Sequence, residues 1–496
     1  MPPRLGTPKV PILIAVGGQA PWVSAGIAAR QLVPHHSYSF SSMMERRSVR
    51  VGYGVIRLAF PVILLFTLIA GDALRYTIGW AGWAVLVVAL ALVSIVILVR
   101  EKASWRLAGL PYPLLTFLVL TAVSIFWSYY PGATALGSAT TIATAAGALA
   151  IAVVCTWGEV LRALAWALRA ILGLSILFEL YVSLIVRSPI LPLVPEPGID
   201  YSALFPVPPM LYWSRNELFH IFTGGKIQGI LGNSVLLSFA ALLGLIVFTL
   251  ELLRSRNRPV QTALWIGIAA FCLAASRSAT IIAATVVVIL IALAVALVRR
   301  ARSARTRAIT YGGLAAVIVL VAVLVSVFNR QILALLGKSE DLTGRVDIWA
   351  TVANLASQRP ILGWGWVSYW VPWAAPFDTL VTRNGVRQLH AHNAWLDVWF
   401  QLGVIGLVVF GALVLTAVVR SWWLAVDAPQ RQAAGPGPYR IETVLPILVL
   451  TALLVQSVAE SRLLVEFGMF FLVLVSVKTK VGARAAIPGS TPFREE

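Results

Sequence analysis

The chain has 496 residues, of which 59% are hydrophobic and only 12% are charged. Soluble domains carry about a quarter charged residues, so this composition and a mean hydropathy of +0.86 predict a polytopic membrane protein instead. The formal charge of +19 does not predict a nucleic-acid partner, because the arginines lie in short loops between apolar runs, where they set membrane topology. Cys155 and Cys272 fall in apolar runs far apart, so neither a disulfide framework nor a metal site at the cysteines is indicated.

The first segment, residues 1–54, is basic and irregular, and its longest apolar run, around residues 10–16, is too short to span a bilayer. No small-residue cleavage site follows a proper apolar core, so we do not expect a cleaved signal peptide. We interpret this segment as a basic cytoplasmic tail and residues 479–496 as a second one, flanking a transmembrane domain at residues 55–478.

A membrane-spanning helix needs roughly 20 mostly apolar residues, because each residue advances about 1.5 Å. On this criterion the sequence predicts an all-α polytopic membrane protein with about 12 transmembrane helices. The seventh and eighth are separated only by a break at residues 276–278, which predicts a tight hairpin or a broken helix. The twelve stretches are 55–71, 80–99, 110–128, 135–156, 161–186, 228–252, 261–276, 278–298, 309–328, 394–419, 443–459 and 462–478.

The distribution of Lys and Arg predicts the orientation of these helices. Basic clusters at residues 100–106, 254–258 and 299–307 fall on one side of the membrane if the amino terminus is cytoplasmic. Both termini are therefore predicted to be cytoplasmic. Two long segments then lie on the outer side, namely residues 187–227 and, between the ninth and tenth helices, residues 329–393.

Some basic residues fall on the outer side, against this bias. Arg277 stands in a turn too short to carry it far from the bilayer, so we expect it to point into a protein cavity or at a bound anion. The outer basic residues to which we give a possible role are Arg215, Lys226, Arg277 and Arg345.

Arg345 stands near the start of a predicted amphipathic helix that would lie along the membrane surface. Thr343 can cap this helix, and Trp349, Val352 and Leu355 are spaced for one apolar face. A cation beside the free N–H groups of a helix N-terminus suits a diphosphate. Taken alone, the pattern favours an ordinary surface arginine.

The same outer segment contains tryptophans and histidines. Residues 360–366 (PILGWGW) predict a tight turn with Trp364 and Trp366 at the bilayer boundary, where aromatic rings are common and only weakly indicate sugar stacking. His390 and His392 precede the tenth helix, and an imidazole that titrates near neutrality can take a proton from a hydroxyl nucleophile. Their i, i+2 spacing, with no Glu or Cys nearby in a ligand pattern, does not predict a zinc site.

Several short motifs, taken in chain order, resemble the O-antigen ligase and polymerase superfamily of bacterial membrane glycosyltransferases. The resemblance covers roughly residues 225–410, and the motif that begins at His392 is the most specific. Val235 stands where family members often carry a second asparagine, which weakens any role for Asn233 and leaves ligase or polymerase open. The motifs are 226–233 (KIQGILGN), 276–279 (SRSA), 344–349 (GRVDIW), 360–365 (PILGWG), 392–396 (HNAWL) and 402–407 (LGVIGL).

The resemblance implies a GT-C-like fold and a metal-independent, inverting transfer at the outer face of the bacterial cytoplasmic (inner) membrane. A glycan would pass from a polyprenyl-diphosphate-linked donor to a hydroxyl of an envelope glycan or glycolipid acceptor. Membrane lipids would be the other partners, with no cofactor and no nucleic acid.

The resemblance also implies roles for individual residues. Without a metal, fixed cations must neutralise the leaving diphosphate. Arg277 and Arg345 would do this, His392 would be the base or orient the acceptor, and His390 is the second choice. The implied substrate-binding residues are Arg215, Lys226, Asn233, Asn393, Trp364 and Trp366.

Two alternatives stay open. A polymerase that joins lipid-linked repeat units would use the same donor site with another acceptor. A transporter or flippase for a lipid-linked oligosaccharide or a solute would fit the helix count equally well, but the sequence has few acidic residues in mid-span that could bind coupling ions. The exceptions, Glu179 and Glu466, are expected to pair with neighbouring polar groups.

Overall fold

The computed structural model describes residues 58–327 and 345–485. The predicted tail at residues 1–54 lies outside the described residues, as do Thr343 and the end of the second tail, residues 486–496. The described ranges have short gaps at 103–104, 198, 200, 202–203, 205, 256, 302, 384–385, 428–429, 432–434 and 437–438.

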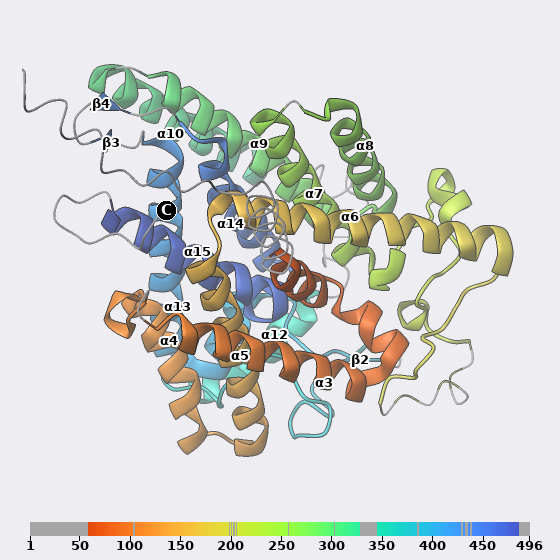
Figure 1. Cartoon of the computed structure of the whole chain (residues 1–496). Coiled ribbons are helices and arrows are strands. Elements are labelled where there is room, and N and C mark those ends of the chain that lie inside the picture. The colour runs from red at the N-terminus through yellow and green to blue at the C-terminus, as the bar shows by residue number, and fades with distance from the viewer. Residues whose placement is uncertain are drawn as a thin grey trace, which may run out of the picture. The chain divides into compact units, whose positions relative to one another are not determined.

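The described chain is mostly helical (Figure 1). Two small antiparallel hairpins join β1 (Thr382–Arg383) to β2 (Val386–Arg387) and β3 (Gln430–Arg431) to β4 (Gly435–Pro436). The helices are Leu58–Ile69, α3 (Gly71–Arg100), α4 (Tyr112–Val123), α5 (Pro131–Val154), α6 (Trp157–Tyr181), α7 (Ser234–Arg254), α8 (Pro259–Ser276), α9 (Ala279–Arg300), α10 (Ala304–Val327), α12 (Arg345–Gln358), α13 (Ala394–Val426), α14 (Leu445–Ser457) and α15 (Glu466–Ala485).

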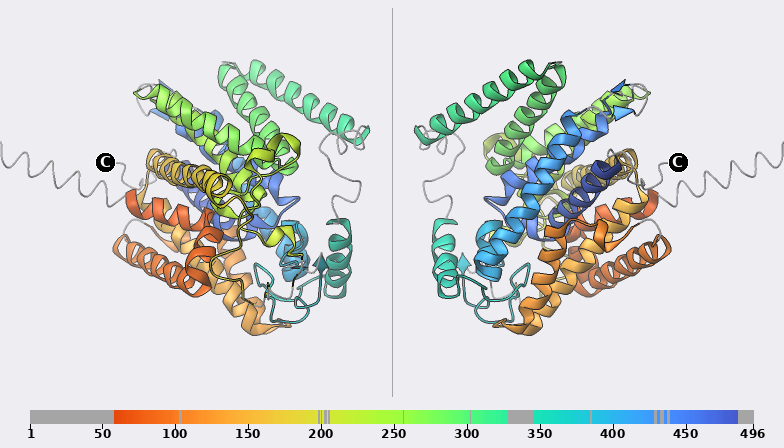
Figure 2. Two further views of the ribbon diagram at one scale, coloured as in Figure 1. Left: turned by 90° about the vertical axis from the view of Figure 1, so that its right-hand side faces the viewer. Right: turned by 90° about the vertical axis from the view of Figure 1, so that its left-hand side faces the viewer.

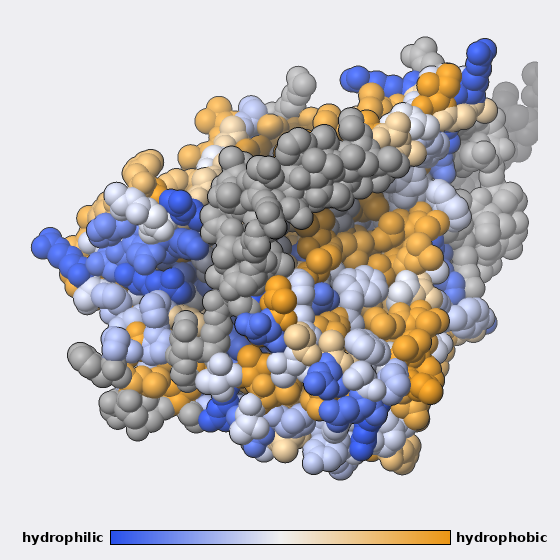
Figure 3. All heavy atoms as spheres, turned by 180° about the vertical axis from the view of Figure 1, so that it is seen from behind, coloured by the Kyte–Doolittle hydropathy of each residue, from blue (hydrophilic) through white to orange (hydrophobic). Residues whose placement is uncertain are grey.

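These helices confirm an all-α, multi-pass membrane protein. Within the described residues, seven of them are long and apolar enough to cross a membrane, and a helix overlaps every one of the twelve predicted stretches. Three of the overlapping helices, Leu58–Ile69, Tyr112–Phe126 and Ile441–Ser457, are shorter, so the number twelve stays a prediction. On the face seen in Figure 3, hydrophobic side chains cover wide areas and hydrophilic ones gather in separate groups, as lipid contact requires.

Arginines gather where several helices end together. Arg299, in the last turn of α9, donates to the carbonyl of Ala425 and to the hydroxyl of Thr443. Arg307 donates to the carbonyl of Val426. These arginines donate hydrogen bonds to the free carbonyls at the end of α13 and balance the partial negative charge of that helix end. This end of the bundle is the one predicted to be cytoplasmic, and the loops that precede α13 and follow α14 lie at the opposite end.

The turn between α8 and α9 is as tight as the sequence predicted. Arg277 has a left-handed backbone, with φ 50°, and caps α8. The two helices then diverge, because α8 packs against α7 whereas α9 packs against α14.

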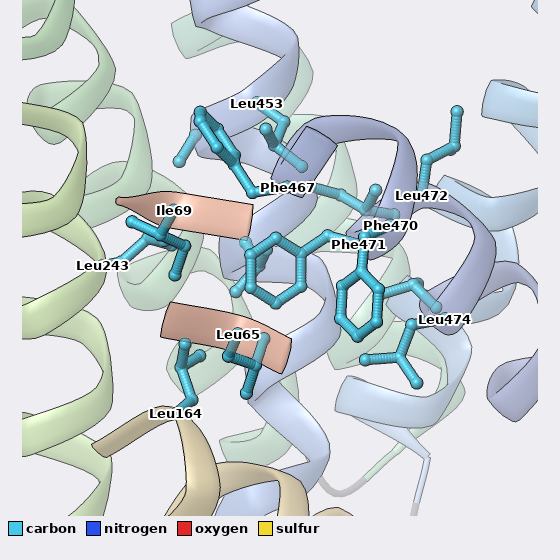
Figure 4. Packing of buried hydrophobic residues seen from close by; sticks show 14 of the residues in the cluster. Leu65, Ile69, Leu164, Leu243, Leu453, Phe467, Phe470, Phe471, Leu472 and Leu474 are labelled. Atoms are coloured by element: carbon cyan, nitrogen blue, oxygen red, sulfur yellow. The ribbon is translucent and has the colours of Figure 1, made fainter. Parts of the chain in front are cut away.

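The main core surrounds α15, which packs against α5 and α13. Phe467 and Phe470 of α15 are fully buried among Leu65, Leu164 and Leu243, which come from three other helices (Figure 4). The amino-terminal part of α13 lies beside α12 and the loop that follows α12 (Figure 2). This arrangement holds the predicted outer segment against the bundle.

Candidate active site

A single carboxylate joins two of the predicted catalytic residues. Glu460, in the turn after α14, accepts a hydrogen bond from Nη2 of Arg345 on Oε1 at 2.6 Å. Its other oxygen, Oε2, lies 3.2 Å from Nδ1 of His392. Helix α12 supplies Arg345, and the loop before α13 supplies His392. The structure therefore brings an arginine and a histidine, 47 positions apart in the printed sequence, into one ionic cluster.

His390 is the buried member of the cluster, with 8% of its surface exposed. Its Nδ1 accepts a hydrogen bond from the backbone N–H of His392 at 3.0 Å. Burial, reinforced by the neighbouring His392, lowers the pKa of His390 well below its ordinary value. His390 is therefore a neutral imidazole whose proton is on Nε2 and whose Nδ1 lone pair is already used, so neither ring nitrogen is free to accept a proton.

Glu460 stays ionised despite its burial. Burial alone would raise its pKa, but the hydrogen bond from His392, the electrostatic interaction with the two imidazoles and the charge of Arg345 outweigh that effect and lower the pKa of Glu460 to about 2. A carboxylate on Nδ1 fixes the tautomer of an imidazole and leaves Nε2 available as the base. Nε2 of His392 lies 3.1 Å from Oε1 of Gln388, whose amide nitrogen donates to the carbonyl of Val386 at 3.2 Å. An acceptor hydroxyl must therefore displace Gln388 to reach Nε2.

A buried acid holds the histidine loop in place. Asp397, in the first turn of α13, is completely buried and accepts hydrogen bonds from the backbone N–H of Ala391 at 3.0 Å and from the indole of Trp370 at 2.9 Å. It also accepts from the hydroxyl of Ser461. Because Ala391 lies between the two histidines and Ser461 follows Glu460, Asp397 positions both sides of the cluster.

Asn393 has a structural task in this loop. Its Oδ1 accepts from the backbone N–H groups of Trp395 and Leu396, so it is the N-cap of α13. Its own backbone N–H donates to the hydroxyl of Ser461. Asn393 thus caps α13 and positions the loop that carries the histidines.

Two of the sequence motifs form one structural unit. Helix α13 breaks at Gly403, where φ is 64° and ψ is −165°. Residues 360–365 run alongside the break: Val404 N–H donates to the carbonyl of Pro360, and Trp364 N–H donates to the carbonyl of Phe400. Gly365 N–H likewise donates to the carbonyl of Gln401. The backbone groups freed by the break are satisfied within the protein, as a membrane environment demands.

Glycine is required on both sides of this unit. A Cβ added at Gly403 would collide with the carbonyl oxygen of Ile361, and one at Gly363 would lie 2.5 Å from the backbone of Gln401. Both glycines also have positive φ. The side chain of Gln401 then receives the backbone N–H groups of Val367 and Ser368, both at 2.9 Å.

The placement predicted for Trp366 is wrong. Its side chain is completely buried, its indole donates to Thr141 Oγ1, and its ring packs edge-on against Phe117. It cannot stack on a sugar, because the packing of α4 and α5 decides its position. Trp364 is only partly buried; its indole donates to the carbonyl of Leu355, and its ring lies under Arg359.

Arg277 does not join the histidine cluster. Its side chain is exposed instead of pointing into a cavity, and Nη1 donates to the carbonyl of Ile221 at 3.1 Å. It lies at the same end of the bundle as Glu460, because the ends of α9 and α14 that meet Arg299 lie at the other. A contact with substrate stays a prediction for Arg277.

The other predicted binding residues lie in the segment that precedes α7. Arg215 donates to the carbonyl of Pro209, and the backbone of Lys226 donates to Glu217. Asn233 caps α7 through the backbone N–H groups of Val235 and Leu236, a structural task like that of Asn393. None of the hydrogen bonds in the described part of the chain joins these three residues to Glu460.

The two acids singled out by the sequence are paired, as predicted. Glu179 accepts from the backbone N–H groups of Gln228 and Gly229 and from the hydroxyl of Ser214. It thereby fixes the glycine-containing segment before α7.

Glu466 belongs to a second charged group beside the cluster. It pairs with Arg75 at 2.8 Å and with Arg462 at 3.0 Å, and both arginines also face Asp72. Tyr369 connects the two groups, since its ring lies 5.8 Å from the Arg462 guanidinium and 5.3 Å from the ring of His390.

His390, His392 and Glu460 together offer donor atoms within 4.8 Å of one another, a set that could hold a metal ion. The hydrogen bonds argue against this use. Nδ1 of His390 already accepts from a backbone N–H, which leaves its proton on Nε2, the nitrogen that faces Glu460. Arg345 meanwhile occupies one oxygen of Glu460. The donor set therefore fits an ionic cluster better than a metal centre.

Glu460, Asp397 and Gln388 were not predicted from the sequence. Glu460 is an acidic residue in a short break between two apolar runs, on the predicted outer side, and that position is the signal that could have identified it. Asp397 looks like an ordinary first-turn acid of a helix. Gln388 carries no signal in the sequence.

Comparison with known proteins identifies the same stretch of chain. Residues 262–411, from α8 into α13, match the model of the O-antigen ligase family. The exopolysaccharide production protein ExoQ of Rhizobium meliloti (strain 1021) is 30% identical over 172 residues, which cover 32% of this chain and 39% of ExoQ. The chain thus spans well under two thirds of the length of this relative.

Proposed function

We propose that the chain is a membrane glycosyltransferase of polysaccharide biosynthesis, because residues 262–411 match the model of the O-antigen ligase family and part of the chain is similar to ExoQ. Its donor is a glycan joined through the anomeric carbon to a polyprenyl diphosphate, and its acceptor is a hydroxyl of an envelope glycan or glycolipid. The reaction takes place at the outer face of the bacterial cytoplasmic membrane.

The chemistry needs one proton acceptor and one fixed cation. The acceptor oxygen bonds to the anomeric carbon from the side opposite the diphosphate, which inverts that centre. The bond from the carbon to the diphosphate oxygen breaks, and the diphosphate leaves with the electron pair. The proton of the acceptor hydroxyl passes to Nε2 of His392, oriented by Glu460. Arg345 neutralises the charge that develops on the diphosphate.

The observation that carries this proposal is the pair of contacts that Glu460 makes with Arg345 and His392. They put a candidate base and a candidate phosphate-binding cation on one carboxylate. In a site with little water, a fixed donor of this kind is worth about 10²–10³ in rate. Arg277 stays a predicted second cation, with Arg215 and Lys226 as helpers.

Cells that lack the protein test this proposal. They should accumulate a lipid-linked glycan, and a plasmid copy of the wild-type chain should remove it. A His392→Ala copy, present in the membrane at the same level, should leave the lipid-linked glycan in place. The proposal is wrong if no lipid-linked glycan accumulates, or if the His392→Ala copy removes it as fast as the wild type.

The length of the product separates a ligase from a polymerase. If the protein is a ligase, the deleted cells should retain finished polymer on the lipid carrier. If it is a polymerase, they should attach single repeat units to the acceptor. A transporter would move lipid-linked glycan across liposomes that contain the purified protein and would form no new glycosidic bond.

A further inference from the structure

The Glu460 carboxylate is shared between two partners with different tasks. Arg345 holds Oε1, and His392 faces Oε2. Arg345 is 21% exposed at its side chain, twice the 10% of Glu460, so the guanidinium is the more accessible member of the ion pair. In the described part of the chain, this is the single hydrogen bond of that guanidinium.

A guanidinium that makes one hydrogen bond to the described residues keeps further N–H donors beyond that bond. Its five N–H groups form a planar fork that can hold an anion through two parallel bonds, and a diphosphate offers more oxygens and more charge than one carboxylate. Glu460 would keep a hydrogen-bond partner if Arg345 left, because Nδ1 of His392 lies 3.2 Å from its other oxygen.

Building on the proposed function, we propose that Glu460 is the hydrogen-bond partner of Arg345 in the unliganded protein. When the donor binds, its diphosphate replaces Glu460 as the partner of the guanidinium. After the donor binds, Glu460 interacts with His392 and no longer with Arg345. The carboxylate, no longer neutralised by the arginine, makes the imidazole a stronger proton acceptor. The base is thus strengthened when a donor is present, and an empty site keeps it weaker.

Glu460→Gln separates this exchange from a purely structural role. The amide no longer competes for Arg345 as an anion, so the variant should bind diphosphate more tightly while its turnover falls, since His392 loses its carboxylate. Damage to the fold would instead lower both the affinity for diphosphate and the turnover. The ion pair is partly exposed, so the gain in affinity should be about threefold to tenfold.

The measurement uses the full-length protein in lipid nanodiscs and titration calorimetry. The probes are inorganic pyrophosphate and farnesyl diphosphate, which distinguish recognition of the diphosphate from recognition of the lipid. Asp378→Asn is the matched control, because it removes one negative charge from an exposed position of the same outer segment. Asp378→Asn should bind both probes like the wild type.

The proposed exchange is wrong if Glu460→Gln binds both probes with unchanged or lower affinity. It is also wrong if Asp378→Asn gains as much affinity as Glu460→Gln. Tighter binding of farnesyl diphosphate alone would also overturn it, because the competition concerns the diphosphate.

If the Glu460→Gln variant does not fold, a measurement on the wild-type protein still tests the proposed exchange. Protein labelled with ¹³C-glutamate should show a shifted carboxylate band in its infrared difference spectrum when pyrophosphate is added, and no shift would contradict the exchange. Failure of this inference differs from failure of the proposed function, because in the second case the wild type itself would transfer no glycan.

Discussion

The hydroxyl of Ser461 donates a hydrogen bond to the carboxylate of Asp397, across 64 positions of the chain. The same carboxylate receives the N–H of Ala391, and the Ser461 oxygen receives the N–H of Asn393. The loop with the two histidines and the turn with Glu460 are therefore held by one buried pair. Their relative position does not depend on the histidine–glutamate contact itself.

Asp397→Asn should disturb this position. An amide offers one oxygen in place of two, so one of the three donors around Asp397 would face an N–H₂ group. A buried donor without a partner costs about 1–3 kcal/mol. We expect the rate of glycan transfer at saturating donor to fall at least about tenfold and the thermal midpoint in detergent to fall as well. Asp378→Asn serves as the control, and equal rates for the two variants would contradict the role of Asp397.

Gly403→Ala should prevent α13 from forming its break. The backbone there has φ 64°, and an added methyl group would collide with the carbonyl of Ile361. The strained backbone alone costs about 1–3 kcal/mol. We expect a large loss of folded protein, measured by size-exclusion chromatography after detergent extraction.

Gly411→Ala is the control in the same helix, because nothing lies within 4 Å of a Cβ at that position. Alanine there should be neutral or stabilise the helix by about 0.5–1 kcal/mol. If both variants fold equally well, the packing of residues 360–365 against the break is not what requires Gly403.

Acid should destabilise the protein in two steps. His390 and Glu460 both have pKa values in the folded protein below their ordinary values of 6.5 and 4.5, with Glu460 at about 2. The unfolded chain therefore takes up protons at a higher pH than the folded one, and stability falls as pH falls. The His390 contribution is lost below about pH 6.5 and the Glu460 contribution below about pH 4.5.

Thermal unfolding in detergent from about pH 7.5 to about pH 2 checks both steps. His390→Asn keeps an oxygen that can accept from the N–H of His392 and should show a smaller loss between pH 6.5 and pH 5. A profile equal to that of the wild type would contradict a neutral, buried His390.

The sequence predicted the helices well, because an apolar run long enough to cross a membrane is a local property. It also singled out the loop with His390, His392 and Asn393 before α13, and the structure places His392 of this loop beside Glu460. A helix that includes Arg345, Trp349, Val352 and Leu355 is confirmed, but its buried side is centred on Val352 with Ile348 and Ala356, not on the Trp349 side.

The remaining features depend on contacts between distant segments. Glu460 lies 68 positions from His392, and no periodicity or spacing connects them. Trp366 is of a residue type that is common at the bilayer boundary, but α4 and α5 bury its side chain inside the protein. The turn at Arg277 was predicted, whereas the carbonyl of Ile221 that receives its side chain was not.

The central claim is that His392 and Arg345 serve one glycosyl transfer. Purified protein in liposomes that contain the lipid-linked glycan of its host tests it most directly, with transferred glycan and released polyprenyl diphosphate measured together. The wild type should produce the two in equal amounts, and His392→Ala and Arg345→Lys should each lower both by about 10² or more. Wild-type rates in either variant, or movement of the glycan lipid without transfer, would contradict the account.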